Sequence, residues 1–161
     1  MTEAPKTEAS KTEVWFYQLQ RRRLDQVLPN LVERVRQRGW RAAIQVATPE
    51  RLSAIDDLLW TYAEESFLPH GAAKDGDPDM QPVWLTLRDD NANGAQARFL
   101  LEGVEAAPFV DQGYERLIVL FDGRDDAMRD LARAQWKKLR QINVELAYWA
   151  ETDEGGWRKQ G

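Results

Sequence analysis

The polar side chains best suited to catalysis or metal binding lie between residues 64 and 70. Glu64, Glu65 and His70 offer two carboxylates and an imidazole, the groups used for metal binding or general base catalysis. They lack the i, i+4 spacing that would gather donors on one helical face, so an ordinary polar loop is the alternative that we favour. Ser66 has no histidine at a spacing typical of nucleophilic catalysis. Because the chain contains no cysteine and only one histidine, we predict no catalytic residue and no metal site.

The chain also lacks the glycine-rich loops that hold nucleotide phosphates. The turn after the first predicted strand reads Gln20-Arg21-Arg22-Arg23, and neither G-x-G-x-x-G nor a P-loop occurs. Gly123 follows an apolar strand, but a single glycine is not a phosphate site. We therefore expect no cofactor. The alternative is that the chain is a nucleotide-dependent enzyme on an α/β scaffold that binds its nucleotide without these motifs.

A basic stripe occupies one face of a predicted helix near the C-terminus. Its members Arg129, Arg133, Trp136, Lys137 and Arg140 follow helical spacing, because they fall at i, i+4, i+7, i+8 and i+11. A stripe of arginines around a tryptophan suits an acidic peptide that ends in an aromatic residue, since guanidinium groups bind carboxylates in pairs of hydrogen bonds. A solvated charged face is the other interpretation. The residues expected to face the sheet are Met128, Leu131, Ala132, Gln135 and Leu139.

A second binding feature lies where a helix ends at Trp60. Phe67 and Leu68 follow and precede Pro69, which cannot continue a helix. Trp60, Phe67 and Leu68 form an unusually large apolar surface for a connection, so they either cover an edge of the core or meet a partner. From these residues alone, a loop packed on its own sheet is the interpretation that we favour.

Hydrophobic periodicity places these residues on an α/β scaffold. The predicted strands cover residues 14–19, 41–47, 83–87, 98–101, 116–121 and 144–149. The predicted helices cover residues 24–38, 48–60 and 125–141. Strands alternating with helices predict a single-domain α/β sandwich, with a mainly parallel central sheet flanked by helices, Rossmann-like without a nucleotide motif.

Composition sets the domain limits and the compartment. With 161 residues, 43% hydrophobic content and seven tryptophans, the chain suits one folded domain over residues 13–150. Residues 1–12 are expected to be a disordered tail and residues 151–161 a flexible one. The net charge of −5 argues against direct tight nucleic-acid binding. The sequence contains no membrane or signal segment, so we expect a cytoplasmic protein.

The same motifs resemble the chi subunit family of the bacterial DNA polymerase III holoenzyme. Leu58-Leu59-Trp60, then residues 66–71 (Ser-Phe-Leu-Pro-His-Gly) and Gln81-Pro82-Val83, match one family region in order and spacing. Leu131-Ala132-Arg133 and Trp136-Lys137 match the basic C-terminal helix of the family. The resemblance covers residues 14–150.

The resemblance implies a non-catalytic accessory subunit that links the clamp-loader complex to single-stranded DNA-binding protein during DNA replication. Arg129, Arg133, Trp136 and Lys137 would bind the acidic C-terminal tail of single-stranded DNA-binding protein. This chain has Arg129 where a lysine is familiar and Trp136 where a tyrosine is familiar, and both changes keep charge or aromaticity. Trp60, Phe67 and Leu68 would seat the psi subunit. A direct nucleic-acid-binding module that uses residues 21–23 and the basic stripe is a third possibility.

Overall fold

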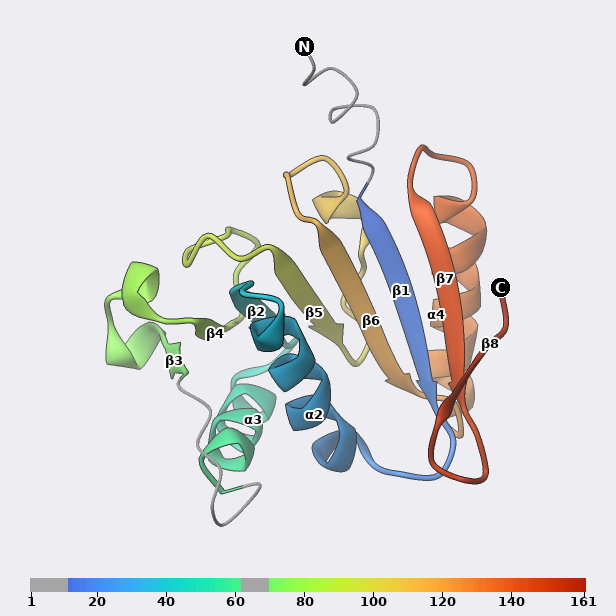
Figure 1. Ribbon diagram of the computed structural model, residues 1–161, viewed down its shortest axis with the longest axis horizontal. Helices are drawn as coiled ribbons and strands as arrows, with labels where there is room; N and C mark the ends of the chain where they lie inside the picture. Colours follow the sequence, from blue (N-terminus) through green and yellow to red (C-terminus); the bar gives the residue numbers. More distant parts are fainter. Residues whose placement is uncertain (1–11, 62–69) are drawn as a thin grey trace.

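The computed structural model describes residues 12–61 and 70–161. In these ranges one sheet has the strand order β3-β4-β2-β5-β6-β1-β7-β8 (Figure 1). The strands are β1 (Glu13–Leu19), β2 (Ala42–Gln45), β3 (Gly71–Ala72), β4 (Val83–Thr86), β5 (Ala97–Leu101), β6 (Arg116–Asp122), β7 (Glu145–Glu151) and β8 (Trp157–Lys159). The described α-helices are α2 (Leu24–Gln37), α3 (Pro49–Thr61) and α4 (Asp126–Leu139).

The sheet is parallel from β3 to β7, and only β8 pairs antiparallel, with β7. Helices α2 and α3 cover one face and α4 lies on the other (Figure 1). Parallel strands need crossover connections, and α2, α3 and α4 supply three of them, so the strands that these helices cover are rich in apolar residues. This arrangement confirms the predicted α/β sandwich.

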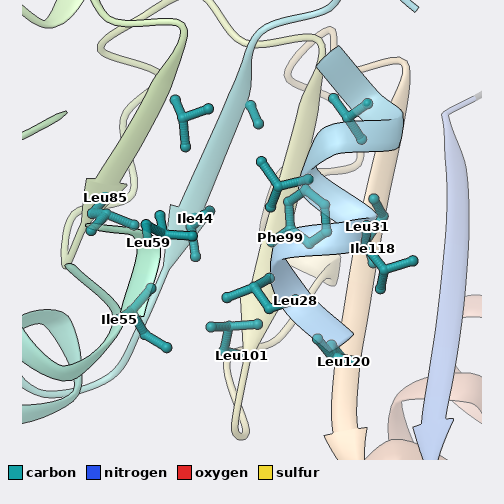
Figure 2. Packing of buried hydrophobic residues seen from close by; sticks show 14 of the residues in the cluster. Leu28, Leu31, Ile44, Ile55, Leu59, Leu85, Phe99, Leu101, Ile118 and Leu120 are labelled. Atoms are coloured by element: carbon teal, nitrogen blue, oxygen red, sulfur yellow. The ribbon is translucent and has the colours of Figure 1, made fainter. Parts of the chain in front are cut away.

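The larger core lies between the sheet and helices α2 and α3. Leu28 and Leu31 of α2 and Ile55 and Leu59 of α3 are all buried there (Figure 2). They meet apolar side chains from the sheet, namely Ile44, Leu85, Phe99, Leu101, Ile118 and Leu120. Full burial of one such side chain stabilises the fold by about 1.5–3 kcal/mol, so this layer fixes the two helices against the sheet.

Helix α4 buries a narrower face than its sequence predicts. Ala132, Gln135 and Leu139 are buried and Met128 is half-buried, whereas Leu131 is 43% exposed, so the prediction that Leu131 faces the sheet is wrong. The buried arc is centred on the i, i+3, i+7 row, and Leu131 lies just outside it. The side-chain oxygen of Gln135 accepts a hydrogen bond from the Ala106 N–H at 2.9 Å, which satisfies a polar group in this layer.

The ends of the domain differ from the sequence prediction. Thr12 is buried, and its hydroxyl donates to the carbonyl oxygens of Val110 and Tyr114, so this residue is part of the folded domain. The rest of the predicted N-terminal tail, residues 1–11, lies outside the described residues. Residues 151–161 were expected to be a flexible tail, but they contain β8, which follows a turn at residues 152–156. Gly155 has a φ of 88°, a conformation that glycine adopts readily, so here the glycine makes a hairpin turn.

Three short 3₁₀ helices lie in the connections of the described ranges. They are η1 (Ala73–Asp75), η2 (Pro78–Met80) and η3 (Ala107–Phe109). The first two lie between β3 and β4, in a segment where the sequence analysis predicts no helix or strand. No helix in the described part of the chain is long and apolar enough to cross a membrane.

Candidate functional site

The basic stripe is positioned by the turn between β6 and α4. Asp125 caps α4, because its carboxylate accepts hydrogen bonds from the N–H groups of Ala127 and Met128. Gly123 precedes this cap and passes close to β1. A Cβ atom at Gly123 would lie 2.4 Å from the Gln18 side chain, so the close approach requires glycine. The turn therefore fixes where α4 begins and which way its stripe faces.

A pocket of about 380 Å³ opens beside α4 and β7. Arg133, Trp136 and Lys137 line it from α4, and Tyr148 lines it from β7. Residues 160 and 161 complete the lining. Three of the four stripe residues assigned to tail binding therefore surround one cavity, which we call the α4 pocket.

Aromatic rings form the base of the α4 pocket. The ring of Trp136 packs edge-to-face against Phe16 and against Tyr148, with centroids 5.5 Å apart in both pairs. Phe16 and Tyr148 stack nearly parallel at 5.8 Å, because parallel pairing of β1 and β7 places them side by side. These contacts hold the Trp136 ring in one orientation and give the pocket an apolar base.

The rim of the pocket is cationic. Arg133 and Lys137 are exposed, and neither forms an ion pair with another described residue. Burial raises the pKa of Tyr148, although the nearby charge of Arg133 opposes that shift, so its hydroxyl stays protonated at neutral pH and donates to Gln18. An apolar base with a cationic rim suits a ligand that carries an aromatic group next to carboxylates.

Arg129 does not line the α4 pocket. Its guanidinium donates to the Gly123 carbonyl oxygen at 2.9 Å and to the Asp126 carboxylate at 2.7 Å, and its Nε atom is buried without a hydrogen-bond partner among the described residues. The helical spacing is correct, but the local ion pair turns Arg129 toward the start of α4. Its role in tail binding stays a prediction.

The sequence analysis missed the part of the pocket contributed by the C-terminal hairpin. Gln160 N–H donates to the Tyr148 carbonyl at 2.6 Å, and Tyr148 N–H donates to the Gly161 carbonyl at 3.1 Å. These bonds continue the pairing of β7 with β8 and place residues 160 and 161 beside Trp136. The signal for Tyr148 was its alternation with Leu146 and Val144 in the final predicted strand, which puts it on the α4 side of the sheet.

The second predicted binding segment is only partly within the described residues. Trp60 lies in the last turn of α3 and is 52% exposed, with its ring centroid 4.9 Å from that of His70. Phe67 and Leu68 lie outside the described residues. The exposure of Trp60 is compatible with a partner surface at the end of α3.

Of the acid–base candidates, His70 lies within the described residues, and it contacts the carboxylate of Asp56. Glu64, Glu65 and Ser66 lie outside the described residues. His70 is buried, and its Nε2 atom lies 2.8 Å from the carboxylate of Asp56, which Lys74 also contacts at 3.0 Å. Burial raises the pKa of Asp56, but hydrogen bonds from Lys74 and His70 outweigh it, so the net shift is downward. Within the described ranges no group of three potential ligands is placed to hold a metal ion.

The turn after β1 is occupied by a carboxylate of the chain itself. Glu151 Oε1 accepts hydrogen bonds from the backbone N–H groups of Gln20, Arg21 and Arg22 at 2.9, 2.7 and 3.1 Å. Its other oxygen accepts from the Arg22 guanidinium. In nucleotide-binding α/β folds, backbone N–H groups at this turn receive a phosphate. Here the same donors are already satisfied by Glu151.

Comparison with known proteins identifies one family. The family model described as DNA polymerase III chi subunit, HolC, matches residues 12–147. A probable DNA polymerase III subunit chi from Rickettsia prowazekii (strain Madrid E) is 24% identical over 97 residues, which cover 57% of this chain and 59% of that protein. The DNA polymerase III subunit chi of Escherichia coli (strain K12) is 26% identical over 113 residues, which cover 69% of this chain and 76% of that protein. The match to the Rickettsia relative thus spans less than two thirds of its length, and the family model ends before β8.

Proposed function

Because the chain belongs to the DNA polymerase III chi subunit family, we propose that it is a non-catalytic replication subunit that links the clamp-loader complex to single-stranded DNA-binding protein in the cytoplasm. Membership of the family confirms the resemblance found in the sequence and supports a role as an accessory subunit in DNA replication. The partners named in this proposal, the acidic tail of single-stranded DNA-binding protein and the psi subunit, rest on the arguments that follow.

The α4 pocket is the observation that carries the tail-binding proposal. Its base of Trp136 and Tyr148 can receive the aromatic side chain of a tail peptide, and Arg133 and Lys137 can pair with carboxylates at the rim. Both cations lack an ion-pair partner among the described residues, so binding a carboxylate would break no existing pair.

The surface at the end of α3 supports the proposal of a second partner. Trp60 is 52% exposed, and tryptophan is enriched among the residues that dominate protein interfaces. We assign the psi subunit to this surface together with Phe67 and Leu68.

The nucleotide-dependent enzyme is the weaker alternative. A nucleotide phosphate at the β1 turn would have to displace Glu151 from three backbone N–H groups and from Arg22. Displacement would place a second anion beside Glu151 or expel a buried carboxylate, and both outcomes carry an electrostatic cost. This observation favours the accessory role.

The proposal is tested by replacing Arg133 with alanine. Loss of a charge-assisted contact at the rim should weaken binding of a peptide that copies the tail by about 1.5–3 kcal/mol, which is roughly ten- to a hundredfold. Lys138→Ala is the matched control, because Lys138 is exposed on the same helix and does not line the pocket. Fluorescence anisotropy at low salt measures both. Equal affinities for the two variants and the parent protein would overturn the assignment.

A further inference from the structure

The sheet face opposite α4 carries an aromatic surface that the proposed function does not use. On this face α3 packs against β4 and α2 packs against β2 and β6, whereas β1 and β7 carry no helix of the described chain there (Figure 1). Four half-buried tryptophans border the core at this place, and we call them the aromatic shelf: Trp15, Trp40, Trp149 and Trp157. More than half of the seven tryptophans therefore lie at one surface.

Three of the four shelf tryptophans are linked by ring contacts, and Arg116 connects Trp40 to Trp15. Trp15 contacts Trp149 with centroids 5.8 Å apart and contacts Tyr17 at 6.3 Å, and Tyr17 stacks under Trp157 at 4.9 Å. The series crosses β1, β7 and β8, so it forms a strip of ring surface across the sheet.

Arginines accompany the rings. Arg116 lies over Trp15 at 3.7 Å and over Trp40 at 5.3 Å, and Arg38 lies over Trp40 at 4.2 Å. A pocket of about 270 Å³ separates α2 from the shelf, with Arg34, Arg38 and Arg116 in its lining and no acidic residue among its lining residues. Glu13 pairs with Arg116, but Arg34 and Arg38 are exposed and form no ion pair within the described ranges.

We propose that the aromatic shelf and the arginines of α2 form a weak binding site for single-stranded nucleic acid, with bases against the tryptophans and phosphates against Arg34 and Arg38. Aromatic platforms beside a cationic groove are the general solution for binding single strands without sequence preference. The affinity belongs to the range of about 10⁻⁴–10⁻⁶ M that non-specific contacts give, which agrees with the absence of tight binding expected from the net charge of −5.

The composition of the shelf favours a nucleic acid over an acidic peptide. An acidic tail with one aromatic end needs one apolar pocket and a cationic rim, which the α4 pocket already offers on the opposite face. The shelf instead offers several rings in sequence beside Arg34 and Arg38, two exposed cations that form no ion pair within the described ranges. A polymer that alternates planar bases with phosphates is complementary to that pattern.

The test uses the full chain and a fluorescein-labelled oligo(dT) of about 12 nucleotides, within the site sizes of single-strand-binding folds. The double variant Arg34→Glu/Arg38→Glu should weaken oligonucleotide binding at least tenfold at about 50 mM salt and lower the salt-dependence slope by about two. Arg88→Glu/Lys138→Glu is the control with the same change of charge, at exposed sites away from the shelf, and should retain most of the parent affinity.

Further arms separate the outcomes. Binding of the tail peptide should be unchanged in Arg34→Glu/Arg38→Glu, so failure of the shelf and failure of the α4 pocket are distinguishable. Trp15→Leu should reduce oligonucleotide binding while a melting curve verifies folding. If Arg88→Glu/Lys138→Glu lost as much oligonucleotide affinity as Arg34→Glu/Arg38→Glu, the effect would be one of net charge, and the proposed site would be overturned. Displacement of the oligonucleotide by the acidic tail peptide, or by dTMP at the same nucleotide concentration, would assign the shelf to a peptide or to a free nucleotide instead.

Discussion

At the residue scale, Glu151 is the charge on which the turn after β1 depends. Its side chain is buried, and burial alone would raise its pKa. The guanidinium of Arg22 and three backbone N–H groups favour the ionised form more strongly, so the pKa of Glu151 falls from 4.5 to about 2. Because the folded state holds the carboxylate ionised, Glu151 stabilises the fold above its unfolded pKa, and this contribution is lost as the pH falls from about 5 to about 2.

The unfolding free energy of Glu151→Gln should therefore depend less steeply on pH in the acid range than that of the parent protein. The parent protein is expected to lose about 3 kcal/mol of unfolding free energy to this group between pH 5 and pH 2, because folding lowers the pKa of Glu151 from 4.5 to about 2. The variant should be less stable than the parent protein at neutral pH, and its unfolding free energy should fall less between pH 5 and pH 2. Urea denaturation at a series of pH values measures it, and parallel profiles for the two proteins would show that Glu151 does not control the acid limb.

Local patterns predicted the residues of the α4 pocket that one helix supplies, and they could not predict the others. Arg133, Trp136 and Lys137 follow from helical spacing. Tyr148 reaches the pocket because β7 pairs with β1, which is distant in sequence, and residues 160 and 161 reach it because β8 folds back on β7 in a hairpin. Arg129 has the right spacing, but its side chain forms an ion pair with Asp126. Spacing fixes a position on a helix, and neighbouring charges then decide where a long side chain points.

At the element scale, helices and central strands were predictable, and the edge strands were not. The periodicity of residues 24–38 and 125–141 matches α2 and α4 to within two residues, because helical patterns are local. β3 has two residues and β8 three, too few for a pattern. β8 also follows a glycine turn that resembles a frayed end, and its stability depends on Trp157 stacking on Tyr17 in β1.

The exposed end of α3 gives a prediction for this element. Trp60→Ala should change the unfolding free energy far less than the ~3–5 kcal/mol typical of a truncated buried aromatic residue, because about half of the residue is already exposed to water. Capture of the psi subunit should nevertheless fall strongly, since aromatic anchors dominate such interfaces. Thermal denaturation and a pull-down measure the two effects. A drop in melting temperature of about ten degrees or more would show that Trp60 is a core residue.

At the scale of the whole molecule, the strand order separates the two proposed protein partners. Trp60 contacts His70, which immediately precedes β3 at one edge of the sheet, and the α4 pocket lies beside β7 and β8 at the other edge (Figure 1). A rigid sheet between two sites lets both partners bind at once. Trp60→Ala should thus leave tail-peptide affinity unchanged.

The central claim is that the chain reaches DNA through the acidic tail of single-stranded DNA-binding protein. Recruitment to DNA coated with single-stranded DNA-binding protein should be measured at about 0.15 M salt. At this ionic strength, interactions between exposed charges that are not in direct contact are largely screened. Coats made from the intact protein and from a form without its acidic tail give the comparison, with Arg133→Ala as a second arm. We expect recruitment to the intact coat, its loss on the tailless coat, and a marked reduction for Arg133→Ala. Full recruitment to the tailless coat would contradict the account.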